Sequence, residues 1–397
     1  MSEQHPKSAK PDDICPRPDK PVNLTTQPLA SAIYPTSVWI CNEPAETDRM
    51  LGGEADGYVY QRDKHPNADA LAEKVRLLHH AECATITSSG MAALSAAALS
   101  VLAPGDHVVL SNQLYGKTSL LFAQELTRLG IMCTAVDTCD HDATRDAMRD
   151  TTKLLVAETI ANPCLQVADI ATLANIAHES GAKLLVDNTF ATPVLCRPLD
   201  LGADLVMESV SKMMNGHSDV MLGALCGGQS SWGRVPVVTS AWGLASSPFD
   251  AWLALRGLAT MHLRMDRACE TSAAVASFLA EQSPVQHVDY PGLSQHPQYE
   301  LATKQFGGRY GSIVTFRLAG GRAAADAFIT ASEAIPFCPS LGEASTTLSH
   351  PETTSHRAKS PTEREALGIG GGTIRLSIGL ESAEFVIKAL KESLSAI

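Results

Sequence analysis

The sequence has too few basic residues for a nucleic-acid-binding surface. Lysine and arginine number 31 against 43 aspartate and glutamate residues, so the formal net charge is −12 (31 minus 43). Proteins hold nucleic acids largely by neutralising phosphates with basic side chains. The charge balance therefore predicts that no nucleic acid is a partner.

The sequence also lacks a long apolar run. No stretch approaches the ~18 apolar residues that a membrane span requires. The longest, 92–103, is interrupted by Ser95 and Ser100. The first 20 residues are polar and rich in proline, without the apolar segment of a secretory signal. We expect no membrane partner, and a flexible arm at the amino terminus.

Closely spaced cysteines are absent as well. None of the ten cysteines forms a CxxC pair, which argues against a zinc site and against a redox motif. We expect most of them to be buried thiols in a reducing cytoplasm, and hence a cytoplasmic protein. His79, His80 and His217 have no third ligand at a suitable spacing, so we predict no metal site and read them as satisfied or surface histidines.

Short apolar strands alternate with helices through the middle of the chain. This alternation predicts an α/β fold with a mostly parallel sheet. The strands expected are 108–110, 154–157, 184–186 and 205–207. The helices expected are 68–80, 90–102, 119–130 and 168–181.

The pattern changes after about residue 260. A long helix is expected over 253–279, and alternating segments follow at 311–318 and 373–378, which indicates a smaller α+β domain. We therefore divide the chain into an N-terminal arm over 1–60, a large domain over 61–260 and a small domain over 261–397.

A lysine and an aspartate carry the strongest chemical signal. Lys212 stands among small hydroxyl residues in the run 209–219, and Asp187 ends an apolar strand 25 positions (212 minus 187) earlier. Such a lysine suits an amine that forms a Schiff base with an aldehyde cofactor, and it must be partly neutral to do so. Such an aspartate suits a carboxylate that keeps a pyridine nitrogen protonated. Together they predict a site for pyridoxal 5′-phosphate (PLP).

The run 209–219 resembles the cofactor-attachment motif of the Cys/Met-metabolism family of PLP-dependent enzymes. That family includes cystathionine γ-synthase, cystathionine lyases, methionine γ-lyase and O-acylhomoserine sulfhydrylases. The match extends from Gln27 and 34–37 to 375–381. The resemblance implies the fold type I PLP-dependent transferase fold, PLP as cofactor, and a homotetramer of two tight dimers in which the arm contacts a neighbouring subunit.

The resemblance also implies where the phosphate of the cofactor binds. A helix that opens at Gly90 offers free N–H groups and a favourable dipole to an anion. The cofactor's phosphate is expected on the residues Ser89, Gly90, Met91, Ser209 and Ser211. Tyr60-Gln61-Arg62 matches a Tyr-x-Arg motif that reaches the phosphate of the neighbouring subunit, with arginine suited to bidentate phosphate binding.

The remaining site residues follow from the same resemblance. Tyr115 is expected to stack on the cofactor ring and to help move protons, with Lys212 as the catalytic base. Asn162, Asp187 and Thr189 are expected around the ring. For the substrate, Arg375 is expected to bind the α-carboxylate, with Ser340 beside it.

The member of the family stays open. Ser345 stands where cystathionine synthases and γ-lyases carry a glutamate, and Lys117 where methionine γ-lyases carry a cysteine; Met213 replaces a tyrosine after the lysine, with no consequence that we derive. We predict β- or γ-elimination at a carbon–sulfur bond of an amino acid. The alternative is a γ-replacement synthase, either a cystathionine γ-synthase or an O-acylhomoserine sulfhydrylase. A catalytically silent binding protein is a third reading, against which the presence of Lys212 and Asp187 argues.

Overall fold

The structure, a computed structural model, describes residues 25, 26 and 28–397. The chain divides into two units, Met1–Ala32 and Ile33–Ile397. Residues 25, 26 and 28–32 of the first unit contain no helix or strand. Residues 1–24 of the predicted arm over 1–60, together with Gln27, lie outside the described residues. All that follows concerns the second unit.

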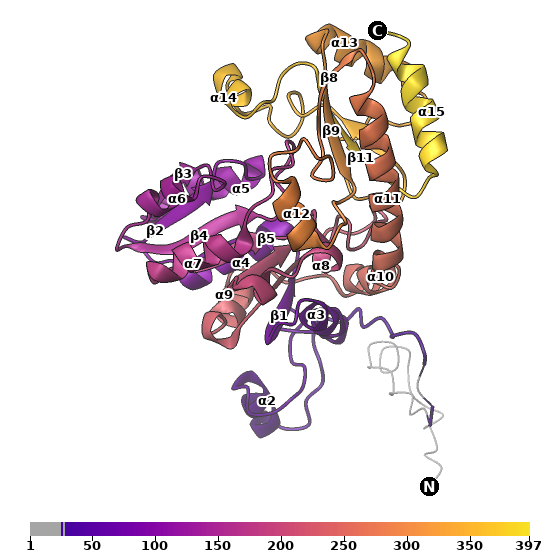
Figure 1. The fold of residues 1–397 in the computed structure, drawn as a ribbon. Coiled ribbons are helices and arrows are strands. Elements are labelled where there is room, and N and C mark those ends of the chain that lie inside the picture. Colours follow the sequence, from indigo (N-terminus) through magenta and orange to yellow (C-terminus); the bar gives the residue numbers. More distant parts are fainter. Residues whose placement is uncertain (1–24, 27) are drawn as a thin grey trace. The chain divides into compact units, whose positions relative to one another are not determined.

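A seven-stranded sheet forms the centre of this unit (Figure 1). The strands β2 to β6 run parallel to one another, whereas β7 is antiparallel to both β1 and β6. This arrangement confirms the predicted mostly parallel sheet. Across the sheet the order is β1 (Cys83–Thr87), β7 (Gly223–Gly227), β6 (Leu205–Glu208), β5 (Lys183–Asp187), β4 (Thr152–Glu158), β2 (His107–Ser111) and β3 (Met132–Val136).

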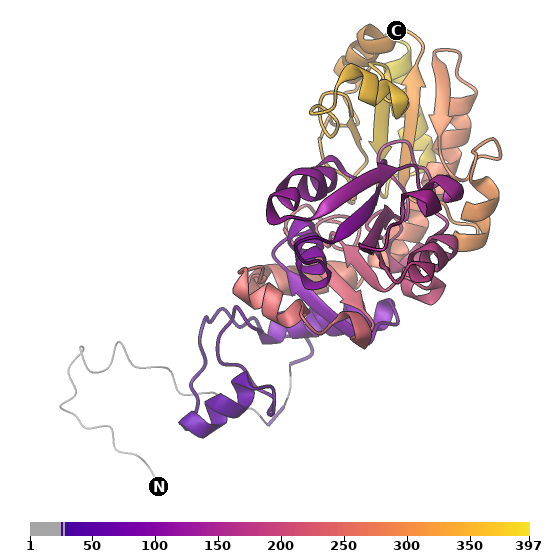
Figure 2. The same ribbon diagram turned by 90° about the vertical axis from the view of Figure 1, so that its left-hand side faces the viewer.

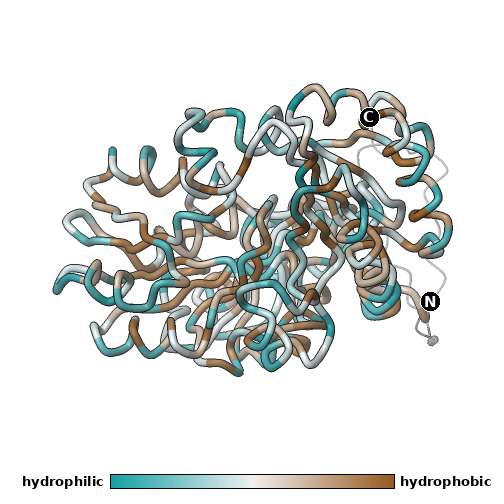
Figure 3. Tube along the Cα trace, turned by 45° about the horizontal axis from the view of Figure 1, so that its top comes forward, coloured by the Kyte–Doolittle hydropathy of each residue, from teal (hydrophilic) through white to brown (hydrophobic). Residues whose placement is uncertain are grey.

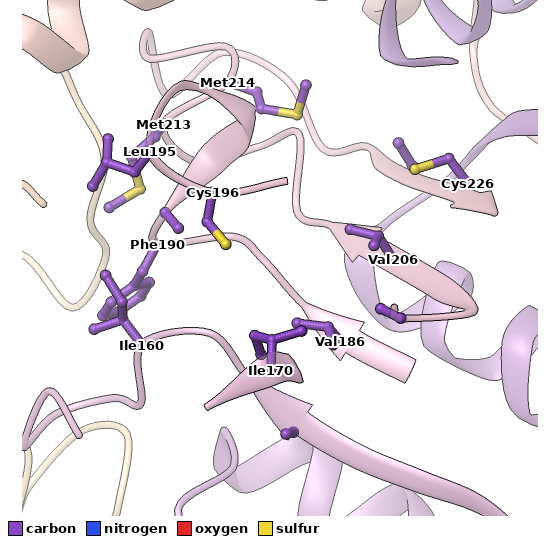
Figure 4. Packing of buried hydrophobic residues seen from close by; sticks show 14 of the residues in the cluster. Ile160, Ile170, Val186, Phe190, Leu195, Cys196, Val206, Met213, Met214 and Cys226 are labelled. Atoms are coloured by element: carbon purple, nitrogen blue, oxygen red, sulfur yellow. The ribbon is translucent and has the colours of Figure 1, made fainter. Parts of the chain in front are cut away.

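Successive residues of the strands face two separate cores, because side chains alternate along a strand. In β4, Leu154 and Val156 pack with helix α4 (Gly90–Val101), while Leu155 and Ala157 pack with α3 (Pro66–Leu78) and α7 (Ile170–Glu179). Figure 4 shows the core on the side of α3 and α7, to which Ile170, Val186, Val206 and Cys226 belong. Figure 3 shows that hydrophobic residues concentrate along the strands in the middle of the molecule.

Local sequence explains where the two helices nearest the site begin. The α3 helix starts at Pro66, a residue that suits the first helical turn, and the Nδ1 atom of His65 accepts a hydrogen bond from Ala68 N at 3.2 Å. The α4 helix starts after Ser89, whose Oγ accepts from Ala92 N at 3.1 Å. Each cap satisfies an amide that the helix itself leaves unpaired.

Two helix predictions need correction. The helix expected over 253–279 is two helices, α10 (Pro248–Leu258) and α11 (Met261–Ala280). The break has a structural cause, since Gly257 O accepts hydrogen bonds from Thr260 N and from the guanidinium of Arg264. The helix expected over 119–130 is a succession of α5 (Gly116–Leu120), a π-helical turn (Leu121–Glu125) and a 3₁₀ turn (Thr127–Leu129).

A four-stranded antiparallel sheet lies beside the first sheet (Figure 2). Its order is β10 (Thr347–Ser349), β11 (Thr373–Ser377), β9 (Ile313–Leu318) and β8 (Val285–Asp289). The α13 (Gly321–Ala331) and α15 (Ala383–Leu394) helices and the end of α11 pack against it. The rings of Phe316 and Phe328 meet edge to face in its core, 5.5 Å apart between centroids.

The other helices are short. They are α2 (Pro44–Leu51), α6 (His141–Ala147), α8 (Thr192–Leu195), α9 (Val235–Ala241), α12 (Tyr299–Phe306) and α14 (Pro361–Ala366). Among the described residues, no helix combines the length and the apolar character needed to cross a bilayer.

Candidate active site

A cavity of about 930 Å³ opens at the carboxyl ends of β4, β5 and β6. Open α/β sheets bind ligands at this edge, and the volume is in the range of small-molecule sites. Loops before β10 and the strand β11 close its other side. Of the predicted site residues, the cavity is lined by Ser89, Gly90, Met91, Tyr115, Asn162, Asp187, Thr189, Ser209, Ser211, Lys212, Ser340 and Arg375.

Asp187 is the last residue of β5 and lies at the floor of the cavity. Thr189 N donates to Asp187 Oδ1 at 3.0 Å. Burial raises the pKa of Asp187 to about 6; hydrogen bonds from Thr189 oppose the rise and the carboxylate of Glu208 adds to it. A buried carboxylate calls for a positive partner, and a protonated pyridine nitrogen is one.

The start of α4 forms an anion cradle at one end of the cavity. The hydroxyl of Ser89 is used on Ala92 N, and the next two residues, Gly90 and Met91, line the cavity with amides that belong to the unpaired first turn of the helix. The strand β7 passes so close that a Cβ on Gly223 would lie 2.2 Å from Ser89 O, which only glycine permits. The geometry of this end suits a phosphate.

Two serines from the turn after β6 complete the cradle. Ser211 Oγ donates to Leu222 O at 3.1 Å and accepts from Leu222 N at 2.9 Å. Ser209 N donates to Thr189 Oγ1 at 2.9 Å, which ties the turn to the residues that follow Asp187. Both serines are thus held at the cavity wall by backbone contacts.

Lys212 projects into the cavity from this turn. Its Nζ donates to Ser340 Oγ at 3.0 Å. Burial lowers the pKa of Lys212, with a contribution from Arg375, while Glu343 and Cys338 oppose the shift. The amine is therefore easier to deprotonate than a surface lysine, which a nucleophile or a base requires.

Arg264 of α11 supports the turn from behind. Its guanidinium donates to Met213 O at 2.7 Å and to Met214 O at 2.8 Å. Burial lowers the pKa of Arg264 to about 10. No signal in the sequence distinguished this arginine from the others, because its partners lie some 50 residues away.

Arg375 approaches Lys212 from β11 of the small sheet. Its Nη1 donates to Asn162 Oδ1 at 2.8 Å and its Nη2 to Ser340 O at 2.9 Å. Burial lowers the pKa of Arg375 to about 10, so it stays cationic near neutral pH. Its buried Nε has no hydrogen-bond partner among the described residues, which leaves a donor for an incoming carboxylate.

The loop that carries Ser340 is packed tightly against the lysine turn. Gly342 has φ +86, and a Cβ there would lie 2.6 Å from Met213 N. Both the left-handed backbone and the close approach require glycine. Ser377 Oγ accepts from Gly342 N at 2.8 Å and anchors the loop to β11.

Glu158 is a site residue that the sequence analysis missed. It ends β4, lines the cavity, and accepts from Tyr115 N at 2.5 Å and from Asn162 N at 3.3 Å. Burial raises the pKa of Glu158 well above its usual range, and Asp187 adds to the rise. A signal was available, because Glu158 ends an apolar parallel strand as Asp187 does.

Tyr60 and Arg62 are not among the residues that line the cavity of this chain. The guanidinium carbon of Arg62 lies 5.0 Å from the centre of the Tyr60 ring. The single chain therefore does not bring this pair to the other predicted residues.

The three positions that were considered for substrate choice, Lys117, Met213 and Ser345, do not line the cavity. Lys117 and Ser345 are exposed and are not among the cavity residues, and Met213 is buried in the core. Glu343 and Cys338 line the cavity at the end where Arg375 stands. One carboxylate oxygen of Glu343 is buried and has no hydrogen-bond partner within the described part of the chain.

Comparison with known sequences decides the family. The sequence profile described as "Cys/Met metabolism PLP-dependent enzyme" matches residues 17–395. The chain belongs to this family. It is therefore a PLP-dependent enzyme with an amino-acid substrate, of the carbon–sulfur lyase or γ-replacement kind.

Relatives of different activity are equally similar to this family member. It is 38% identical over 372 residues to the L-methionine gamma-lyase of Porphyromonas gingivalis, covering 93% of each chain. It is 38% identical over 366 residues to the O-succinylhomoserine sulfhydrylase of Pseudomonas aeruginosa, covering 92% of this chain and 91% of the relative. A Campylobacter jejuni crystal structure that carries N′-pyridoxyl-lysine-5′-monophosphate superposes with a TM-score of 0.90, at 25% identity over 94% of this chain and 96% of that one.

The stability of this PLP enzyme without its cofactor is expected to fall as the pH rises from about 4 to about 6. The folded-state pKa of Asp187, about 6, exceeds its usual 3.8, so the folded state binds the extra proton. Its contribution to stability is full below pH 3.8 and is lost as the pH passes 6. Thermal melts of the apoenzyme measure this, and Asp187→Asn should flatten that part of the pH profile. Equal pH slopes in the two proteins would contradict the assignment of Asp187 as an uncompensated buried acid.

Proposed function

We propose that this enzyme is a carbon–sulfur lyase that eliminates a thiol from Cβ or Cγ of a sulfur amino acid. One observation carries the proposal: Ser340 contacts both the proposed base, Lys212, and the proposed carboxylate-binding residue, Arg375. Its hydroxyl accepts from Lys212 Nζ at 3.0 Å and its carbonyl from Arg375 Nη2 at 2.9 Å. An amino acid whose carboxylate sits on Arg375 has its α-carbon beside the lysine, which is the arrangement that proton abstraction needs.

The residues that would hold PLP follow from the cavity. The amides of Gly90 and Met91, with Ser209 and Ser211, would bind the phosphate, and Ser89 would keep α4 in place. Asp187, fixed by Thr189, would pair with the ring nitrogen. Asn162 accepts from Arg375 through Oδ1, so its Nδ2 can donate to the ring oxygen. PLP, when bound, supplies the electron sink for the substrate's carbanion.

The protein's own groups would then move protons. Lys212 Nζ takes the α-proton and holds it, and the hydroxyl of Ser340 fixes the position of the amine. Tyr115 stands at the mouth of the cavity, anchored through its backbone on Glu158, where its phenol can stack on the ring and pass a proton to the leaving sulfur. Ile160 and Phe190 give the cavity apolar walls that exclude water from the reacting atoms.

A γ-replacement synthase is the second candidate, supported by the similarity to the sulfhydrylase of Pseudomonas aeruginosa. The two are separated by measuring 2-oxo acid release from an O-acyl-homoserine, with and without cysteine or sulfide. Release that persists unchanged with the thiol supports the lyase, and methionine and cystathionine are then tested as substrates. Release that falls while a thioether or thiol amino acid accumulates makes the synthase the better assignment.

We also propose a cytoplasmic homotetramer of two tight dimers, with an arm over 1–60, a large domain over 61–260 and a small domain over 261–397. The described part of the arm supports this assembly. Val38, Leu51 and Ile40 are exposed there, Ile40 to 82%. Large apolar side chains grouped in this way favour burial against another chain. Tyr60 and Arg62 would reach the phosphate site of the neighbouring subunit.

Mixing two inactive variants is expected to restore activity if Arg62 acts in the neighbouring site. A mixed dimer of Lys212→Ala and Arg62→Ala chains contains one site with both residues intact. Co-refolded equal mixtures should recover about a quarter of wild-type activity, because half of the dimers are mixed and half of their sites are complete. Arg76→Ala, mixed in the same way, is the control, since Arg76 is paired with Glu73 on the surface. Absence of recovery would count against Arg62 acting across the dimer interface.

A further inference from the structure

A buried polar network lies on the face of the large sheet opposite the cavity. Thr159, Asn188 and Glu208 stand at the ends of β4, β5 and β6, where side chains alternate with those of Glu158, Asp187 and Ser209. Thr159 Oγ1 donates to Asn188 Oδ1 at 2.7 Å. Asn188 Nδ2 donates to Glu208 Oε1 and to Cys196 O, each at 3.0 Å.

His79 lies beside the Glu208 end of this network. It follows α3 directly, and its Nε2 lies 3.1 Å from Glu208 Oε1, with side-chain exposures of 0% and 1%. His79 was predicted to be a satisfied or surface histidine, but it is buried and faces a carboxylate, and neither ring nitrogen has a well-aligned hydrogen-bond partner among the described residues. Among the described residues, His79 is the one basic side chain that pairs with Glu208.

The other titratable groups around Glu208 do not compensate its charge. Asp187 from β5 is itself acidic, and Cys226 from β7 and Cys196 beside Asn188 are thiols whose pKa burial raises, so they stay neutral. Burial raises the pKa of Glu208, and His79 and Asn188 oppose the rise. An ionised Glu208 therefore depends on His79 for its counter-charge.

We propose that His79 and Glu208 form a charged positioning pair behind Asp187, which holds the strand ends in register and sets the electrostatic potential at the cofactor's ring nitrogen. The proposal rests on the proposed role of Asp187. Asn188, the residue after Asp187, donates to Glu208, and the charge of Glu208 acts on Asp187. The pair thus places its negative end toward the site. Neither residue touches substrate or cofactor.

The pH titration of the bound cofactor's visible absorption band tests the pair in the holoenzyme. Glu208→Gln removes the nearer negative charge and is expected to lower the midpoint by about half to one pH unit. His79→Gln removes the counter-charge, so the buried Glu208 takes up a proton and the midpoint is expected to fall in the same direction. Each variant should also bind PLP roughly tenfold more weakly, because mutation of a residue that supports a binding group generally lowers the affinity for the ligand. Fluorescence titration of the apoenzyme measures this affinity.

His80→Gln is the matched control. His80 is the next residue, but it is exposed and pairs with Asp200 at 3.0 Å. It should leave both the midpoint and the PLP affinity unchanged. Midpoints equal to wild type in Glu208→Gln and His79→Gln, even with lowered melting temperatures, would overturn the proposal and leave the pair a structural contact only.

Two further variants keep the result interpretable. If His79→Gln does not fold, the exchanged pair His79→Glu with Glu208→His restores the buried contact with its charge reversed, and its midpoint is expected to lie below that of the wild type. No shift in a folded exchanged pair would also overturn the proposal. Asp187→Asn separates this inference from the proposed role of Asp187. An unchanged midpoint in Asp187→Asn would refute the role of Asp187 itself. A changed midpoint in Asp187→Asn, together with an unchanged one in Glu208→Gln, would refute only the role of the His79–Glu208 pair.

Discussion

Lys212→Ala is expected to lower kcat by roughly 10⁴-fold while PLP still binds. Alanine removes the amine that takes the α-proton, but the phosphate cradle and Asp187 do not depend on it. The hydrogen bond from Nζ to Ser340 Oγ at 3.0 Å would also be lost, although both partners face the cavity, where water can replace it. Steady-state rates and equilibrium binding of PLP to the apoenzyme measure the two effects separately.

Lys117→Ala provides a control for the loss of a lysine near the site. Lys117 is exposed and is not among the cavity residues, so its removal should leave kcat within about twofold. A Lys212→Ala enzyme with near-normal turnover would contradict the assignment of the catalytic base. A Lys117→Ala enzyme with a comparable loss would show that turnover is sensitive to any charge change in this region.

Arg375→Lys is expected to lower kcat/KM by roughly 10² to 10³-fold, mainly through KM. A lysine cannot reproduce the fork that bonds Asn162 and Ser340 while a third donor, Nε, remains for the substrate. The loss should be specific to substrates with an α-carboxylate. The amine that corresponds to the substrate without its carboxylate, used as an inhibitor, should bind the variant and the wild type with similar Ki.

Arg317→Lys is the matched control for this substitution. Arg317 lies on the neighbouring strand β9, where it pairs with Asp289 at 3.1 Å and is not among the cavity residues. It should leave KM near the wild-type value. An unchanged KM in Arg375→Lys would mean that another group binds the α-carboxylate, and the proposed orientation of the substrate would be wrong.

The parts of the site that could be predicted from the sequence are those encoded within a few residues. Lys212 among its serines and Asp187 at the end of an apolar strand both carry a local pattern, and the fold class follows from the alternation of strands and helices. The strands β1, β3 and β7 were not predicted. For β7 the reason is physical, because its glycines weaken the strand pattern; Gly223 makes room for Ser89 O and Gly227 for Asp204 O.

Contacts between distant segments could not be predicted in the same way. Arg264 of α11 contacts the lysine turn, and His79, which directly follows α3, contacts Glu208 at the end of β6. Neither residue lies in a local sequence pattern that predicts its contact. At the break between α10 and α11, the guanidinium of Arg264 bonds Gly257 O and is held in place by Met213 O and Met214 O of the distant lysine turn. Tyr60 and Arg62 remain predictions because their proposed partners belong to another chain.

The hydrogen-bond partners of Arg375 give the site a preorganised character. Both are neutral, an amide oxygen and a carbonyl oxygen, so the guanidinium is dehydrated during folding without a hydrogen-bonded anion. Holding a cation this way weakens the folded protein, since an apolar side chain of similar size would be easier to bury. The substrate's carboxylate then meets a donor that is already stripped of water and already oriented. Affinity for amino acids is in this sense built into the enzyme at the expense of its own thermal stability.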